Sequence, residues 1–205
     1  MRKVLLVDDH PVVREGIARI LALRIPGLQI AEAEDGLRAV EQLRQAPFDL
    51  VLLDLTLPGD SGLSLLRRLR REFVVPILVV SMHPVDQFAQ RALQAGAAGY
   101  VAKDSDPEEV VRAVSTALAG GRYVPVELQE AARLEEAPPP HGALSDREYQ
   151  VLRMIGSGRT VSEIGTELGL SVKTVSTYRA RILEKLELRT SAELIHYAVV
   201  NKLGS

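Results

Sequence analysis

Several polar residues that could act together in chemistry stand directly after short apolar runs of the sequence. They are Asp8 and Asp9 after residues 4–7, Asp54 after residues 50–53, Ser81 after residues 77–80 and Lys103 after residues 100–102. Short apolar runs without polar alternation are typical of parallel strands that are buried on both faces. The carboxyl ends of such strands share one edge of the sheet, where ligands bind. The sequence therefore predicts that three carboxylates, a hydroxyl and an ammonium meet at that edge.

These side chains suit one kind of chemistry. Carboxylate oxygens hold hard divalent cations such as Mg²⁺. A carboxylate can also act as a nucleophile and form an acyl phosphate, while a lysine ammonium supplies a compact positive charge for phosphoryl oxygens. We therefore expect a divalent cation and a transferable phosphoryl group at this edge of the sheet.

The elements that must position these residues alternate between strand and helix patterns up to residue 119. The predicted strands are residues 3–8, 28–33, 49–54, 76–81 and 98–102. Apolar residues recur at helical spacing between them, and Asp106-Pro107-Glu108-Glu109 has the cap, proline and acids of a helix start. Five strands alternating with five helices predict an α/β fold with a doubly wound parallel sheet.

The composition changes after Gly120-Gly121, which ends the first predicted domain, residues 1–120. Residues 121–143 contain Glu135-Glu136 and Pro138-Pro139-Pro140 and read as an acidic, semi-rigid linker. Residues 126–136 in its middle could form a short helix. The third predicted segment, residues 144–205, has helical patterns throughout.

Capping boxes mark the helices of residues 144–205. They pair Ser145 with Glu148, Thr160 with Glu163, and Thr190 with Glu193. A fourth helix is expected from Ser171, after a turn at Gly169-Leu170. Four short helices, the middle two joined by a tight glycine turn, predict a small all-α helix-turn-helix domain.

Composition and charge limit the classes of protein to consider. The 205 residues include no cysteine, which excludes disulfides and thiolate metal sites. No stretch reaches the roughly 18 apolar residues that span a membrane, and the apolar run after Met1-Arg2-Lys3 is too short for a signal sequence. A soluble cytoplasmic protein is expected.

The charge distribution is uneven although the net charge is only −2. Residues 144–205 hold nine Lys and Arg against seven Asp and Glu, and residues 171–189 hold five basic residues against Glu184 and Glu187. Such a basic stretch indicates either a polyanion partner or a solvated helix face.

Taken together, the motifs resemble a two-component response regulator of the NarL/FixJ type, over nearly the whole chain. The receiver part rests on Asp8-Asp9, Asp54-Leu-Thr-Leu-Pro58 with Gly62, Ser81-Met82-His83 and residues 95–103. The C-terminal part is similar to the LuxR-type DNA-binding domain through residues 144–152, 163–168 and 170–178. The resemblance implies sheet order 2-1-3-4-5, phosphorylation by a sensor histidine kinase, and transcriptional control.

For the receiver, the resemblance implies that Asp54 is the phosphoacceptor and that Mg²⁺ is the cofactor. Asp9, Asp54 and the backbone carbonyl of Thr56 are the expected ligands, with Asp8 binding directly or through water. Lys103 would pair with the phosphoryl oxygens as a point charge.

The resemblance also implies a conformational switch. Ser81 would donate a hydrogen bond to the phosphoryl group, and its movement would make room for Tyr100 to swing inward. Thr56 and His83 would border the phosphate and tune its hydrolysis. Asp104 follows Lys103 where many receivers have proline, so a trans peptide is expected there.

In the helix from Ser171, Val175, Ile182 and Leu186 mark the inward face by their spacing. The opposite face would enter the major groove of DNA. The small residues expected near base edges are Ser176, Thr177 and Ala180. The residues expected at DNA phosphates are Lys173, Tyr178, Arg179, Arg181 and Lys185.

Two other classes of protein share some of these features. An aspartyl phosphatase also uses a strand-end aspartate, but it usually has a second acid two residues later, where this chain has Thr56. A ligand-sensing regulator would have an apolar pocket in the first domain. We therefore expect a regulator and not an enzyme. Its expected partners are a histidine kinase, promoter DNA, a second copy of the phosphorylated chain and RNA polymerase, and no membrane.

Overall fold

The computed structural model describes residues 1–57, 62–82, 85–126, 128, 140–201 and 203. They divide into two compact units, Met1–Glu136 and Ala137–Ser205, each of which is described by itself. The predictions made for Pro58 and His83, and most of the short helix predicted at 126–136, fall outside the described residues.

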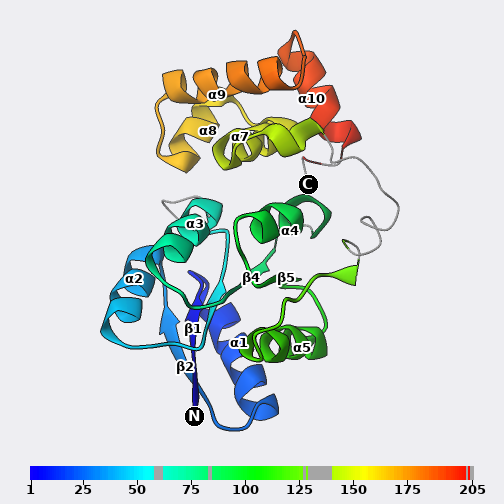
Figure 1. Cartoon of the computed structure of the whole chain (residues 1–205). Helices are drawn as coiled ribbons and strands as arrows, with labels where there is room; N and C mark the ends of the chain where they lie inside the picture. Colours follow the sequence, from blue (N-terminus) through cyan, green and yellow to red (C-terminus); the bar gives the residue numbers. More distant parts are fainter. Residues whose placement is uncertain (58–61, 83–84, 127, 129–139, 202, 204–205) are drawn as a thin grey trace. The chain divides into compact units, whose positions relative to one another are not determined.

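The first unit is a five-stranded sheet between two layers of helices (Figure 1). Its strands are β1 (Arg2–Val7), β2 (Leu28–Ala33), β3 (Leu50–Leu53), β4 (Ile77–Ser81) and β5 (Gly99–Ala102). Its helices are α1 (Pro11–Arg24), α2 (Gly36–Gln45), α3 (Gly62–Glu72), α4 (Val85–Gln94) and α5 (Pro107–Leu118). All strand pairs are parallel and their order is β2-β1-β3-β4-β5, which confirms the predicted fold.

The strands lie within one residue of their predicted bounds because the apolar runs are buried on both faces. Residues 4–7, 50–53 and 77–80 are all at most 2% exposed. Helices α1 and α5 pack on one face of the sheet, with Leu21 and Val114 in the core between them. Helices α2, α3 and α4 cover the other face (Figure 1).

Local sequence signals also fix the start of α5. The Asp106 side chain accepts a hydrogen bond from the Glu108 N–H at 2.8 Å, and Pro107 occupies the first turn. The start of this helix is therefore as predicted, since a cap acceptor and a proline both suit the first turn.

The second unit consists of helices only. They are the short 3-10 helix η1 (Pro140–Ala143) and the helices α7 (Asp146–Gly156), α8 (Val161–Leu168), α9 (Val172–Lys185) and α10 (Ser191–Val200). Each of the four longer helices contributes at least one fully buried apolar side chain, among them Leu152, Ile164, Val175 and Leu194. Gly169 ends α8 with a φ of 65°, a left-handed conformation that glycine adopts without strain.

Two of the three predicted capping boxes form completely, at Ser145 and at Thr160. At the third, Thr190 accepts the Glu193 N–H, but the Glu193 carboxylate accepts the N–H of Arg189 at 2.7 Å, one residue before the cap. The cap is therefore in place, and its return hydrogen bond reaches one residue further back than predicted. Among the described residues, every helix is too short or too polar to cross a lipid bilayer.

Candidate functional site

The predicted cluster of polar side chains forms at the carboxyl edge of the sheet. Asp8 follows β1, Asp54 follows β3, and Lys103 follows β5. The Lys103 ammonium lies 2.5 Å from Asp8 Oδ2 and 2.8 Å from Asp54 Oδ2. All three side chains are at most 4% exposed. A buried cation thus bridges two buried carboxylates, an arrangement that keeps both charges close to where a phosphoryl group would sit.

Thr56 is bound directly to the Asp54 carboxylate. Its hydroxyl lies 2.7 Å from Oδ1 and 2.9 Å from Oδ2, and its N–H donates to Oδ1 at 3.1 Å. The sequence predicts that Thr56 borders the phosphate and offers its carbonyl to Mg²⁺, but it does not predict this direct contact with Asp54.

Asp9 is held less firmly than its neighbour Asp8. Its Oδ1 is buried and accepts no hydrogen bond from any described residue, although the His10 ring Nδ1 lies 2.8 Å away. Ligand atoms of Asp8, Asp9, His10 and Asp54 all lie within 4.8 Å of one another. A buried carboxylate oxygen that accepts no hydrogen bond, within a group of three carboxylates and one imidazole, fits a divalent cation that the carboxylates would hold.

The two predicted switch residues are both fully buried. Ser81 and Tyr100 each have 0% exposure. The Tyr100 ring is thus packed inside the receiver, and its movement on phosphorylation stays a prediction. No described residue has a cis peptide, so the bond from Lys103 to Asp104 is trans, as expected.

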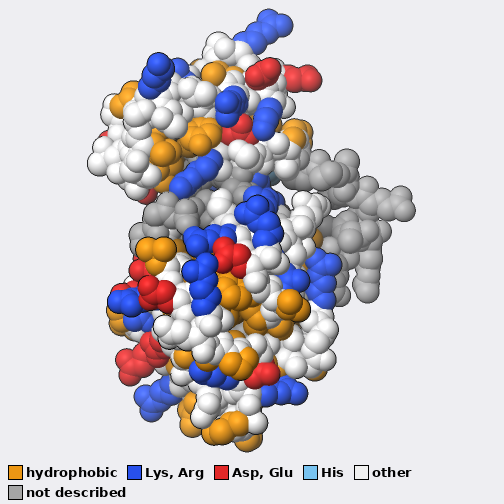
Figure 2. Space-filling view, turned by 60° about the vertical axis from the view of Figure 1, so that its left-hand side comes forward, with side chains coloured by type: hydrophobic (Ala, Val, Ile, Leu, Met, Phe, Trp, Pro, Cys, Tyr) orange, Lys and Arg blue, Asp and Glu red, His pale blue; other side chains and the backbone are white. Residues whose placement is uncertain are grey.

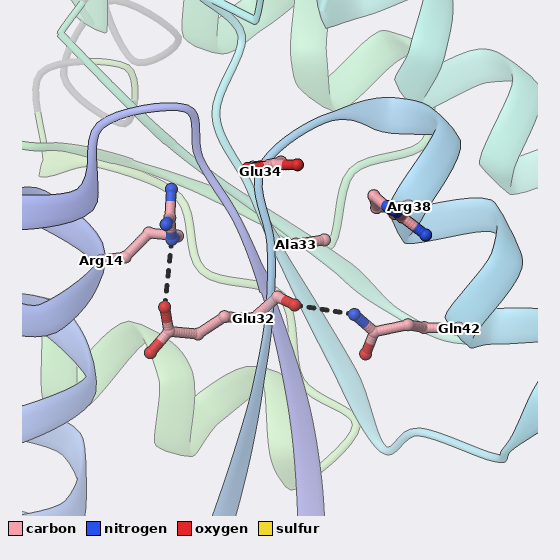
Figure 3. Close-up of a pocket in the computed structure, with 6 residues that line it drawn as sticks. All are labelled: Arg14, Glu32, Ala33, Glu34, Arg38 and Gln42. Carbon is pink, nitrogen blue, oxygen red and sulfur yellow. Dashed lines mark hydrogen bonds and ion pairs between the residues drawn. The ribbon is translucent and has the colours of Figure 1, made fainter.

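The sequence motifs do not identify Arg14, which contacts the backbone of the loop that carries Asp8 and Asp9. Its guanidinium donates to the Asp8 carbonyl at 2.6 Å and pairs with Glu32 at 3.0 Å. Arg14 lines a cavity of about 350 Å³ between α1, β2 and α2 (Figure 3). The signal was present, because Arg14 lies three and seven residues before Ile17 and Leu21 on the core-facing side of α1.

In the second unit, α8 and α9 form the predicted helix-turn-helix. Val175 and Ile182 of α9 are fully buried and Leu186 is nearly so, which confirms the predicted inward face. The structure leaves Lys173, Thr177, Ala180 and Arg181 exposed, and Ser176, Tyr178 and Arg179 half-buried. The hydroxyl of Thr177 donates to the Lys173 carbonyl at 3.0 Å, so its lone pairs stay available as acceptors.

Lys185 differs from the other basic residues of α9 because it already has an ion partner. Its ammonium lies 2.6 Å from the carboxylate of Glu148, whose side chain is only 4% exposed. Burial opposes ionisation of Glu148, but donors on Lys185 and Ser145 outweigh it and hold the pKa of this carboxyl below its usual value. Lys185 therefore ties α9 to α7, and any phosphate would share its ammonium with Glu148.

The surface of the second unit carries both signs of charge. On the face visible in Figure 2, Lys and Arg side chains are interspersed with acidic and apolar ones. A DNA interface on this unit would therefore be defined by the shape of α9 as well as by charge.

Comparisons with known proteins match both units. Residues 4–115 match the response regulator receiver domain, and residues 142–198 match the family of bacterial regulatory proteins described as luxR. Response regulator UvrY of Escherichia coli K12 is 39% identical over 206 residues, which cover 97% of this chain and 94% of UvrY. Response regulator GacA of Pseudomonas aeruginosa PAO1 is 41% identical over 206 residues, which cover 97% and 96% of the two chains.

A solved structure is similar over nearly the same length. RcsB of Salmonella enterica serovar Typhimurium, bound to the promoter rprA with the phosphomimetic BeF3−, aligns with a TM-score of 0.69 at 26% identity. The alignment covers 96% of this chain and 98% of RcsB. With the sheet order, the acidic site and the helix-turn-helix in place, the chain belongs to the response regulators of the NarL/FixJ type, which regulate transcription through a LuxR-type DNA-binding domain.

Proposed function

We propose that Asp54 accepts a phosphoryl group from the phosphohistidine of a sensor kinase, and that this modification controls DNA binding by the second unit. The observation that carries the proposal is the buried Lys103 ammonium between Asp8 and Asp54, at 2.5 and 2.8 Å. In the transfer, an Asp54 oxygen would form a bond to phosphorus while the bond from phosphorus to the histidine nitrogen breaks. The nitrogen keeps the electron pair of that bond, as a leaving group must.

The residues of this site would divide the work between them. Lys103 would form an ion pair with the negatively charged phosphoryl oxygens, since its ammonium already lies beside the Asp54 carboxylate. Ser81, which is fully buried at the end of β4, would donate a hydrogen bond to the phosphoryl group. The Tyr100 side chain would change its position in response to the movement of Ser81. Thr56 would release one Asp54 oxygen and keep the other oriented.

Mg²⁺ is the cofactor that the ligand set favours. Asp9 and Asp54 would hold it, with the Thr56 carbonyl as a third ligand and Asp8 binding directly or through water. When bound, the ion neutralises charge on the transferring group, which is the main need in phosphoryl transfer. The buried Oδ1 of Asp9 supports this assignment, because no described residue donates a hydrogen bond to it and a bound cation would satisfy it in addition to the nearby His10 ring.

In the second unit, we assign the exposed face of α9 to the major groove. Ser176, Thr177 and Ala180 would approach base edges, and Lys173, Tyr178, Arg179 and Arg181 would contact phosphates. Lys185 would contribute mainly by its ion pair with Glu148. The promoter complex of RcsB supports a DNA target for this unit.

Phosphorylation would act by pairing two copies of the chain, so that two DNA-binding units engage two half-sites about one helical turn apart. The receiver helices α1 and α5 are the surface that we propose for this dimer, and several of their apolar residues, among them Leu21, Val110 and Val114, lie in the receiver core. A dimer through these helices would therefore use their outer faces. RNA polymerase would be a further partner at the promoter. The threonine at position 56 supports a stoichiometric acceptor over a hydrolase with turnover.

Acetyl phosphate with Mg²⁺ tests the assignment directly. The full chain should take up one phosphoryl group per molecule, detected as a mass increase, and Asp54→Asn should take up none. Asp49→Asn provides the matched control. Asp49 directly precedes β3, at the opposite end of the strand from Asp54, and its carboxylate accepts a hydrogen bond from the Lys3 N–H. Phosphorylation that persists in Asp54→Asn would refute the assignment of the acceptor.

A further inference from the structure

Arg14 is an unusually buried arginine in the receiver, with a side chain only 14% exposed. It lies in the first turns of α1, beside the loop that carries Asp8 and Asp9. Its guanidinium is used at two points, since one terminal NH₂ donates to the Asp8 carbonyl at 2.6 Å and Nε donates to Glu32 at 3.0 Å. Figure 3 shows Arg14 and Glu32 reaching toward one another across the side of the cavity next to α1.

The carbonyl that Arg14 binds belongs to the peptide joining Asp8 to Asp9. The N–H of Asp8, which precedes this peptide in the chain, still donates to the carbonyl of Ala33, the last residue of β2, at 3.1 Å. The chain then leaves the sheet, and β2 offers no donor for the next carbonyl. Arg14 supplies that donor, and because a peptide unit is planar, fixing its carbonyl also fixes the direction in which the chain enters Asp9.

The two neighbouring carboxylates depend on this peptide to different degrees. The Asp8 side chain is anchored by the Lys103 ammonium at 2.5 Å and by the His10 N–H at 2.8 Å. The Oδ1 atom of Asp9 accepts no hydrogen bond within the described part of the chain, and the His10 ring nitrogen that lies 2.8 Å from it belongs to a side chain that is 60% exposed. The place of the Asp9 carboxylate is therefore set mainly by its backbone.

We propose that Arg14 is the positioning residue of the cation site, and that it acts on Asp9 through the peptide between Asp8 and Asp9. The proposal rests on the assignment of Asp9 as a cation ligand. Glu32 fixes the orientation of Arg14, because its carboxylate accepts a hydrogen bond from Arg14 Nε. The planar guanidinium then directs one of its NH₂ groups at the Asp8 carbonyl. Gln42 in turn donates to the Glu32 carbonyl at 2.7 Å and ties this strand end to α2 (Figure 3).

Mg²⁺ titrations of the full chain, followed by amide chemical shifts, test the proposal. Groups that orient metal ligands typically change affinity about 10–100-fold when they are removed, and we expect Arg14→Met to weaken Mg²⁺ binding within that range. Glu32→Gln should have a smaller effect, because Arg14 keeps its bond to the carbonyl. Arg38→Gln is the matched control: Arg38 lines the same cavity but is 63% exposed and pairs with Glu41.

A thermodynamic cycle separates positioning from a general loss of stability. In an Asp9→Asn background, Arg14→Met should cost little further Mg²⁺ affinity, because its target is already removed. In the metal-free protein, the Asp9 amide signal should shift in Arg14→Met and stay in place in Arg38→Gln. Arg14→Lys, which can still donate to the Asp8 carbonyl, should keep more Mg²⁺ affinity than Arg14→Met. If Arg14→Met does not fold, Glu32→Gln is used instead: it should weaken Mg²⁺ binding and shift the Asp9 amide signal, and Arg38→Gln should do neither.

The outcomes are distinct. Wild-type affinity in folded Arg14→Met, or in Glu32→Gln where Arg14→Met does not fold, would overturn the positioning role and leave the proposed function intact. Fully independent effects of Arg14→Met and Asp9→Asn would also overturn it, since they would show that Arg14 does not act through Asp9. Absence of Mg²⁺ binding by the wild-type chain would overturn the cation site itself, and the positioning role with it.

Discussion

Removing the Lys103 ammonium should destabilise the receiver strongly when divalent cations are absent. Lys103→Met leaves Asp8 and Asp54, each 1% exposed, without the cation that lies 2.5 and 2.8 Å from them. Breaking a buried ion pair by removing one partner typically costs about 3–5 kcal/mol. We expect the lower end of that range, because Asp8 keeps the His10 N–H and Asp54 keeps the Thr56 hydroxyl.

Mg²⁺ should recover much of this loss, since a bound cation would replace the missing charge. A ligand at 100 times its dissociation constant stabilises the folded state by about 2.7 kcal/mol. Two carboxylates without their ammonium should bind the ion more tightly, so Mg²⁺ should stabilise Lys103→Met more than it stabilises wild type. The double variant Asp8→Asn/Lys103→Met should recover stability without Mg²⁺, because it removes one of the two unpaired charges.

Urea denaturation, followed through amide NMR signals of the receiver with and without Mg²⁺, measures these differences free of the second unit. Lys173→Met, which removes an exposed lysine from the other unit, controls for the change of net charge. A free energy of unfolding for Lys103→Met within about 1 kcal/mol of wild type would refute the reasoning, since it is far below the range for a broken buried pair. Equal stabilisation of both proteins by Mg²⁺ would show that the ion does not take the place of the ammonium.

Three further predictions concern other parts of the chain. The pKa of Glu148 is lowered in the folded protein, so its ion pair with Lys185 should stabilise the second unit fully at pH values above the usual glutamate pKa of about 4.3. This stabilisation should be lost as pH falls through the folded pKa. Denaturation measured at a series of decreasing pH values should therefore show a shrinking difference in stability between wild type and Glu148→Gln. Lys173→Ala should reduce the salt dependence of DNA binding by roughly 0.9 in slope, and an unchanged slope in a salt titration would contradict a phosphate contact. Gly62→Ala should cost about 1–3 kcal/mol in thermal unfolding, because its Cβ would lie 2.2 Å from the Leu55 backbone, whereas Gly16→Ala, with open space around it, should be neutral or stabilising.

Much of the fold could be predicted because its signals are local. A short apolar run such as residues 50–53, bounded by polar residues, favours a buried parallel strand, and the polar residue after it marks the edge of the sheet. The caps at Asp106, Ser145 and Thr160 involve residues two or three positions apart, so the sequence contains both partners of each hydrogen bond. In the third capping box the Glu193 carboxylate accepts the Arg189 N–H and not that of Thr190, a choice that the sequence pattern does not specify.

The types of the site residues, and their meeting at one edge, also follow from the sequence. Strand order brings Asp8, Asp54 and Lys103 together once the sheet is parallel. The spacing of residues along the sequence does not predict how deeply each side chain is buried or which atoms it contacts. The sequence left Tyr100 free to swing inward, yet packing around β5 already buries it completely, and Thr56 already occupies both oxygens of Asp54.

The parallel sheet, the helix-turn-helix and the set of side chains at the carboxyl edge follow from local patterns, because hydrophobic period, caps and strand ends act over a few residues. Which atoms meet across long separations along the chain depends on tertiary packing. Arg14 reaches Glu32 from 18 residues away, Lys185 reaches Glu148 from 37, and Lys103 reaches Asp54 from 49. Each of these contacts depends on distances of a few ångströms between separate elements, and such distances are fixed by packing and not by any pattern along the chain.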